Sequence, residues 1–182
     1  MKMKNVFLLI FLLILESNAN FLKYFRNLDS SYSYSNYQAI SINTNLDGET
    51  LTSSTVDQSV VYITSTGITI TNSNLNKESG DSSNTENSEF YGVNAAVLVN
   101  KGGVTITDGT IETSATGGNA VCATNSGTVT ISGTTITSKA NSSGRGLHAT
   151  YGGSITASKV TISSTGGSCA TLATDRGEGK EL

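Results

Sequence analysis

A repeat of about 25 residues fills most of this 182-residue chain and limits its fold more than any other feature. Each copy is marked by a glycine that closes one short segment of alternating apolar residues and precedes another. These glycines stand 36, 24, 26 and 24 residues apart and are Gly67, Gly103, Gly127, Gly153 and Gly177. Repeats of 20–50 residues are typical of stacked architectures, in which each copy buries its apolar face against its neighbours.

Each copy has the alternation that indicates short strands. In one copy, Val97 and Val99 stand in a first segment before Gly103, and a second segment begins at Val104. A third aliphatic residue follows seven positions after the start of the second segment, and the same spacing gives Leu75, Ile111, Ile136 and Ile162. Three strands per copy are therefore predicted, and each recurring glycine is expected to adopt a positive φ at the corner between the first two strands.

Three strands in about 25 residues predict an all-β fold, a right-handed parallel β-helix with five to six coils of roughly 25 residues. The right hand follows from the general preference of parallel crossover connections. A leucine-rich repeat needs a leucine-asparagine signature and a helical half, and neither occurs here. A propeller blade takes about 40–45 residues, which is too long for this repeat.

Three segments are predicted along the chain. Residues 1–19 have the features of a secretory signal peptide, because two lysines precede an apolar run that ends before the small-residue site Ser17-Asn18-Ala19. The alternative is an uncleaved membrane anchor, but this run falls short of the roughly 20 residues that span a bilayer. Residues 38–182 form the β-helix and end in an incomplete coil, and no transmembrane span is expected in the mature chain.

The segment between them, residues 20–37, is rich in aromatic residues. We expect it to cap the first coil, since a solenoid has to cover its terminal edge. A Tyr-rich strip that stacks on sugar rings is the alternative. Residues 76–90 are interpreted as a solvated acidic loop inserted after a third strand.

Composition narrows the classes of partner. The net charge is −3 and the isoelectric point about 5.1, which argues against a nucleic-acid partner that depends on phosphate neutralisation. Apolar residues make up only 36% of the chain, and Ser and Thr occupy most outward positions, which suits a thin core between stacked strands. No cofactor and no metal site is expected, because neither an EF-hand spacing nor a glycine-aspartate calcium repeat is present.

One outward position recurs just before each glycine. It is predicted to form an exposed column, a candidate contact surface, made of Tyr62, Leu98, Cys122, His148 and Leu172. The column is partly apolar, so packing under loops is the alternative, and the sequence does not choose between the two.

Cys122 and Cys169 are predicted not to be bonded to each other, because they lie two coils apart and face opposite ways. An exposed Cys122 would then be a candidate for intermolecular pairing. The sequon Asn141-Ser142-Ser143 is a candidate N-glycosylation site.

No catalytic constellation emerges from the repeat alignment. Glycoside hydrolysis needs two carboxyl groups that face one cleft. Asp108 and Glu112 fall on one coil, and Asp175 stands beside Arg176 near the last glycine, so the acids are scattered. A nucleophile elbow of the G-x-S-x-G kind is also missing. Enzymatic activity is therefore left uncertain, with its absence favoured.

Three segments resemble a known kind of protein: ENSEFYGVNAAVLVN, GRGLHATYGGSITAS and GGSCATLATDRGEG. They are similar to stretches of long, secreted, Ser/Thr-rich right-handed β-helix proteins of gut microbes that are described as adhesin-like. The resemblance covers about residues 38–179. It implies that further coils follow the DRGEG segment, so this chain is expected to be a truncated member. A remoter resemblance to pectate-lyase-like β-helices concerns the fold alone.

These observations predict a secreted, extracellular or cell-surface adhesin-like module that has no catalytic activity of its own. Its expected partners are a polysaccharide, a glycoprotein or another cell-surface ligand, together with end-to-end self-association through open strand edges. The alternative is a carbohydrate-active β-helix, a relic of a polysaccharide lyase or glycoside hydrolase, or a carbohydrate-binding fragment. A threonine-ladder ice binder is a weaker third hypothesis, because the threonine pairs and coil lengths are uneven.

Overall fold

The computed structural model describes residues 32–175 and 180–181. The predicted signal peptide, most of the predicted cap segment and Gly177 lie outside these residues. The chain divides into two compact units, residues 1–34 and 35–182, and the repeats lie in the second unit.

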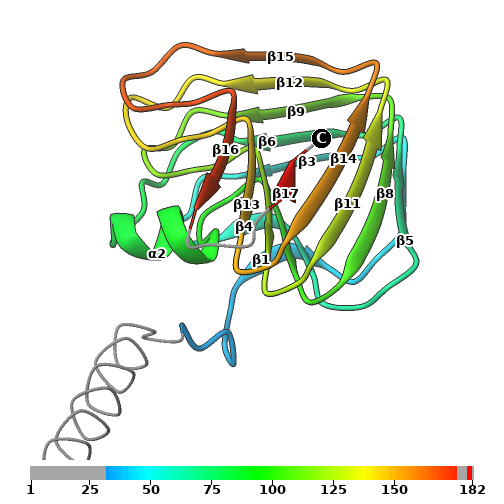
Figure 1. Ribbon diagram of the computed structural model, residues 1–182, viewed down its shortest axis with the longest axis horizontal. Helices are drawn as coiled ribbons and strands as arrows, with labels where there is room; N and C mark the ends of the chain where they lie inside the picture. The colour runs from blue at the N-terminus through cyan, green and yellow to red at the C-terminus, as the bar shows by residue number, and fades with distance from the viewer. Residues whose placement is uncertain (1–31, 176–179, 182) are drawn as a thin grey trace, which may run out of the picture. The chain divides into compact units, whose positions relative to one another are not determined.

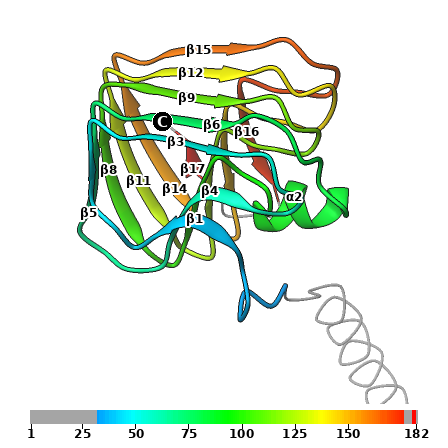
Figure 2. The same cartoon turned by 180° about the vertical axis from the view of Figure 1, so that it is seen from behind.

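The second unit is a parallel β-solenoid of about five turns with roughly 25 residues each. Figures 1 and 2 show the strands of successive turns stacked side by side. Each full turn contributes one strand to each of three parallel sheets. Among the described residues there is one helix, α2 (Thr85–Tyr91), within an all-β architecture. The predicted parallel β-helix is therefore confirmed.

The sheets are named A, B and C in the order in which a turn visits them. Sheet A consists of β1 (Ala39–Ile42), β4 (Ser59–Ile63), β7 (Val97–Asn100), β10 (Val121–Thr124), β13 (Leu147–Thr150) and β16 (Leu172–Asp175). Sheet B consists of β2 (Leu46–Asp47), β5 (Ile68–Thr71), β8 (Gly103–Thr107), β11 (Thr128–Ser132), β14 (Ser154–Ser158) and β17 (Lys180–Glu181). Sheet C consists of β3 (Thr50–Ser53), β6 (Asn74–Lys77), β9 (Thr110–Thr113), β12 (Thr135–Ser138) and β15 (Thr161–Ser164).

The register between turns matches the repeat alignment over most of the solenoid. The third aliphatic residues pair directly from turn to turn along sheet C, in the order Leu51, Leu75, Ile111, Ile136 and Ile162. In the last turn the register differs by one residue from the prediction. Leu147 pairs with Leu172 rather than with Thr171, and His148 pairs with Ala173.

The core is one continuous stack of aliphatic side chains inside the three sheets. Ile70, Ile106 and Ile131 come from neighbouring strands of sheet B and are at most 1% exposed. Most strands contribute alternate residues to this stack, because successive side chains point to opposite faces, and β4 contributes the consecutive residues Val60 and Val61. The low apolar content of the chain is therefore enough to fill a narrow core.

The repeat glycines do not all have the role that we predicted. Gly67 has a φ of 78°, in the left-handed region, as expected. Gly103, Gly127 and Gly153 have no positive φ, so the predicted reason is wrong for these three. The left-handed residues at their corners are Lys101, Asn125, Ser126, Tyr151 and Gly152.

Close backbone approach explains Gly127 and Gly153. A Cβ atom at Gly127 would overlap the carbonyl oxygen of Val99, and one at Gly153 would overlap that of Ala123. Both oxygens belong to the preceding turn of the solenoid. A side chain at either glycine would therefore push two turns apart.

These two roles predict different costs for alanine. Gly67→Ala should lower the free energy of unfolding by about 1–2 kcal/mol, because alanine is strained in the left-handed conformation although its Cβ atom would meet no atom within 4 Å. Gly153→Ala should cost more, because the backbone carbonyl of Ala123 cannot move without disturbing the ladder. Denaturant titrations followed by circular dichroism measure both costs. The exposed substitution Thr156→Ala is the control and should change stability by no more than about 0.5 kcal/mol. A Gly153→Ala variant as stable as this control would contradict the account.

Candidate functional site

The predicted column on the outer side of sheet A is aligned but not exposed. Tyr62, Leu98, Cys122 and His148 pair in succession across four strands, as the repeat alignment predicted. Their side chains are nevertheless buried, at 6%, 0%, 0% and 0% exposure. Leu172 is 54% exposed, but it pairs with Leu147 and is not in register with the other four. The predicted contact surface is therefore wrong for the first four residues, which pack under other parts of the chain.

The segment that covers this column includes the inserted residues between β6 and β7. Gly92 follows α2, and a Cβ atom there would overlap Cys122 Sγ and come within 2.7 Å of Leu98 Cδ1. At one end of the column the Tyr37 ring meets the Tyr62 ring edge-on, with centroids 4.9 Å apart. Sheet A is thus buried on both faces over its middle strands.

Helix α2 forms because its ends are capped. The side chain of Asn84 accepts hydrogen bonds from the backbone N–H groups of Glu86 and Asn87, which would otherwise lack helical partners. Gly92 ends the helix with a φ of 69°, the left-handed conformation that glycine adopts freely. The prediction of a solvated loop over residues 76–90 is therefore wrong in part, because the segment contains a packed helix and the end of β6.

Polar contacts hold α2 against the solenoid. Asn119 Nδ2 donates a hydrogen bond of 3.0 Å to the carbonyl oxygen of Ser88. Glu89 Oε1 lies 3.8 Å from Arg145 Nη2. The ring of Tyr91 stacks on the ring of Tyr151, with centroids 5.2 Å apart and an angle of 15° between the planes. The helix is therefore a fixed part of the fold.

His148 is a fully buried, neutral imidazole beneath this cover. Its Nδ1 atom lies 3.9 Å from Cys122 Sγ, while its Nε2 atom finds no hydrogen-bond partner among the described residues. Burial lowers the pKa of His148 to about 3, and the nearby charge of Arg145 acts in the same direction. His148 therefore stays neutral at physiological pH and does not face solvent.

Both cysteines are thiols, and they form no disulfide with each other. Cys122 is fully buried under α2, so the prediction of an exposed thiol available for intermolecular pairing is wrong. Cys169 is partly exposed, and its Sγ atom accepts a hydrogen bond of 3.3 Å from the backbone N–H of Gly144.

Lys77 is a buried cation that sequence reasoning placed in a loop. It ends β6, is fully buried, and donates a hydrogen bond from Nζ to the carbonyl oxygen of Thr55. Burial lowers its pKa to about 8, although the carboxylates of Asp57 and Asp81 act in the opposite direction. In the neighbouring turn Ser53 occupies the same position, and its hydroxyl donates a hydrogen bond to Gln58 Oε1. Lys77 makes its hydrogen bond from the same position with a longer side chain.

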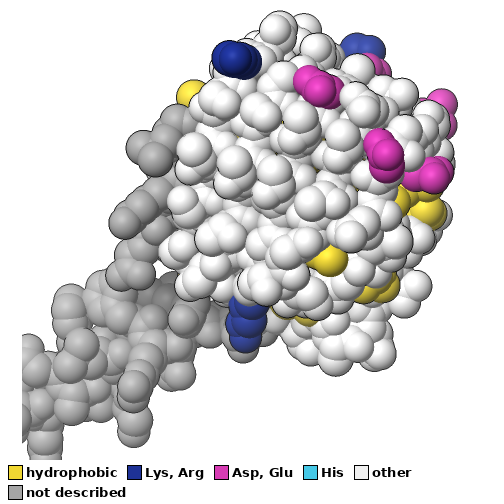
Figure 3. All heavy atoms as spheres, turned by 90° about the vertical axis from the view of Figure 1, so that its right-hand side faces the viewer, with side chains coloured by type: hydrophobic (Ala, Val, Ile, Leu, Met, Phe, Trp, Pro, Cys, Tyr) yellow, Lys and Arg dark blue, Asp and Glu magenta, His cyan; other side chains and the backbone are white. Residues whose placement is uncertain are grey.

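The outer face of sheet B is open, and its aliphatic residues point the other way, into the core. Thr69, Thr105, Thr130 and Thr156 pair in succession across four strands, and all four are exposed. Figure 3 views this face and shows charged side chains towards its rim, while its middle carries neither charged side chains nor a large apolar patch. The surface there consists of hydroxyl groups, methyl groups and backbone.

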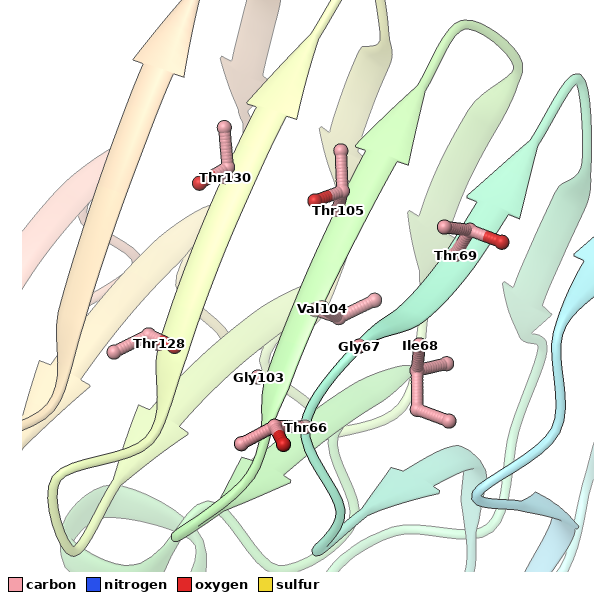
Figure 4. A pocket seen from close by; sticks show the side chains of 9 residues that line it. All are labelled: Thr66, Gly67, Ile68, Thr69, Gly103, Val104, Thr105, Thr128 and Thr130. Atoms are coloured by element: carbon pink, nitrogen blue, oxygen red, sulfur yellow. The ribbon is translucent and has the colours of Figure 1, made fainter.

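A shallow groove of about 270 Å³ crosses this face (Figure 4). The residues that line it come from β5, β8, β11 and the corners that precede them. They are Thr66, Gly67, Ile68, Thr69, Gly103, Val104, Thr105, Thr128 and Thr130. Two of the predicted corner glycines, Gly67 and Gly103, thus line the groove, whereas the sequence predicts only an uneven threonine ladder here.

Sheet C is also rich in Thr, but its outer face carries charges. Lys139 Nζ lies 2.5 Å from Glu112 Oε1 in an exposed ion pair. The hydroxyl of Thr110 donates a hydrogen bond of 2.7 Å to Asn74 Oδ1. The exterior of sheet C thus carries an ion pair and a hydrogen bond between side chains of neighbouring turns.

Three further predictions concern a glycosylation site, a metal site and a membrane span. The Asn141 side chain is exposed, and its glycosylation stays a prediction. Over residues 32–175 and 180–181 no group of three or more His, Cys, Asp and Glu residues is arranged to hold a metal ion. Within the same residues no helix is long and apolar enough to cross a membrane.

Comparisons of the chain with protein families, with curated proteins and with solved structures found no match. The solenoid fold therefore rests on the structure alone. The resemblance to adhesin-like proteins of gut microbes stays a prediction.

The buried His148 predicts a defined dependence of stability on acid. Its pKa is lower in the folded chain than in the unfolded chain. The stability that the neutral imidazole contributes is therefore present above pH 6.5 and is lost as the pH falls towards 3. Between pH 6.5 and 5 we expect His148 to lower the free energy of unfolding by about 2 kcal/mol, since one pKa unit corresponds to about 1.4 kcal/mol.

Denaturant unfolding at several pH values between 7 and 5 measures this loss. The matched variant is His148→Leu, because leucine already occupies the same column at Leu98. The variant should lose markedly less stability than the native chain over this range. Parallel pH profiles for the two proteins would contradict the buried, neutral histidine.

Proposed function

We propose that this chain is a secreted or cell-surface adhesin-like binding module with no catalytic activity of its own. The observation that carries the proposal is the in-register, exposed threonine column of sheet B beside a groove. A hydroxyl group both donates and accepts hydrogen bonds, so a regular column of them suits a ligand with many polar groups. The ligand class is a polysaccharide, a glycoprotein or another cell-surface molecule.

The architecture supports a binding role. Threonines stacked on neighbouring strands have their positions set by the backbone ladder, about 4.7–4.9 Å apart. A ligand that meets such a surface does not have to order it first, which lowers the entropic cost of binding. The apolar run and small-residue site of residues 1–19 support export, and the adhesin-like resemblance supports placement at a cell surface.

Self-association is part of the same proposal. The order of sheet C begins at β3 and ends at β15, so each of these strands offers one edge to another chain within the described structure. Parallel edges at opposite ends of a solenoid are complementary, and two copies can pair head to tail.

Retention on surfaces tests the binding role. Purified protein is passed over immobilised mucin, a panel of polysaccharides and whole cells, and we expect saturable retention on at least one of them. The same protein after thermal unfolding is the control, because a role of the folded surface requires that retention be lost. No retention on any surface would overturn the proposal, and release of reducing ends or unsaturated sugars would contradict the absence of catalysis.

A further inference from the structure

The threonine hydroxyls of sheet B are available to an external ligand. Within the described residues, no intramolecular hydrogen bond engages the hydroxyl groups of Thr69, Thr105 or Thr130. On sheet C, by contrast, the hydroxyl of Thr110 is engaged by Asn74. Within the described residues, the exposed hydroxyl groups of Thr135 and Thr161 on sheet C are also unengaged, so free hydroxyl groups occur on both faces and the groove is what distinguishes sheet B.

Two residues without side chains, Gly67 and Gly103, line the groove. Gly103 pairs with Thr128, so a residue with a side chain at position 103 would continue the outward column. A Cβ atom there would lie 3.0 Å from Thr128 Oγ1 and 3.7 Å from Thr66 Cγ2. Figure 4 shows Thr69, Thr105 and Thr130 in an unbroken row, and below that row Gly103 without a side chain beside Thr128. The glycine thus leaves room for an external group beside backbone and hydroxyl groups.

The groove carries no charge. Its lining contains no Asp, Glu, Lys, Arg or His residue, and the chain as a whole has a net charge of −3. An acidic glycan would find no cation in the groove and a mildly repulsive protein around it. A cationic ligand would find no carboxylate there. The lining therefore favours an uncharged ligand.

We propose that this groove binds a linear, uncharged polysaccharide whose chain runs across the strands, along the solenoid axis. Each turn offers one threonine at a step of about 4.8 Å, which is similar to the advance of one sugar in an extended chain. A sugar ring presents hydroxyl groups at its edge and C–H groups on its faces, and threonine presents a hydroxyl and a methyl group. The inference rests on the proposed binding function and specifies its site and ligand class.

Isosteric removal of hydroxyl groups tests the site. The double variant Thr105→Val, Thr130→Val keeps the branched shape that suits a strand and removes two hydroxyl groups from the groove. The matched control is Thr135→Val, Thr161→Val, which changes two exposed threonines of sheet C. Calorimetric titrations use neutral hexasaccharides of glucose, mannose and xylose, with hexagalacturonate as the anionic comparison.

We expect the native protein to bind at least one neutral hexasaccharide more tightly than hexagalacturonate. The groove variant should bind it at least tenfold more weakly, and the sheet C control should bind it as the native protein does. Gly103→Thr, which fills the gap, should also abolish binding, with circular dichroism spectra to show that each variant is folded.

Two results would overturn the inference and leave the binding module intact. One is native affinity in the groove variant, and the other is preferential binding of hexagalacturonate. Inhibition of ice recrystallisation without any glycan binding would overturn it in favour of ice as the ligand of the ladder. Retention of the native protein on mucin or cells, unchanged in the groove variant, would assign binding to another surface. The proposed binding function itself would be overturned if the native protein were retained on none of the surfaces.

Discussion

Parallel hydrogen bonding between successive turns is the interaction on which the rest of this structure depends. It places equivalent residues of each repeat directly above one another, at about 4.8 Å. Inward residues therefore form aliphatic columns such as Ile70, Ile106 and Ile131, and outward residues form equally regular columns of threonine. The glycines at Gly127 and Gly153 serve the same ladder, because they let one turn approach the carbonyl groups of the turn before it.

The outer surfaces of the solenoid differ because one insertion interrupts the repeat. The residues between β6 and β7 form α2 and bury the column of Leu98, Cys122 and His148 on sheet A. Burying a histidine without a full set of hydrogen bonds costs stability in acid, since its charged form cannot be solvated there. The threonine face of sheet B stays exposed, and two residues without side chains, Gly67 and Gly103, line its groove.

Much of the fold was predictable from local patterns. The spacing of seven residues to Ile111 and Ile136 identified the third strand and its partners correctly, because the register along sheet C is the same in every turn. The alignment was wrong by one residue at Leu172, in the last turn of sheet A. The burial of Cys122 was not predictable with certainty, because alternation along a strand says which face a residue occupies but not what covers that face. Glycine spacing likewise located the corners without distinguishing a positive φ from close packing.

The period, the three strands of each turn and the aliphatic columns of the core can be predicted from the residues alone, since they follow from local alternation repeated at a constant interval. Which outer face is covered and which is open cannot be predicted in this way. That choice depends on where α2 folds back, on the contact between Gly92 and Cys122, and on the gap at Gly103 beside Thr128. These are contacts between residues distant in sequence, and their geometry arises only when the turns have stacked.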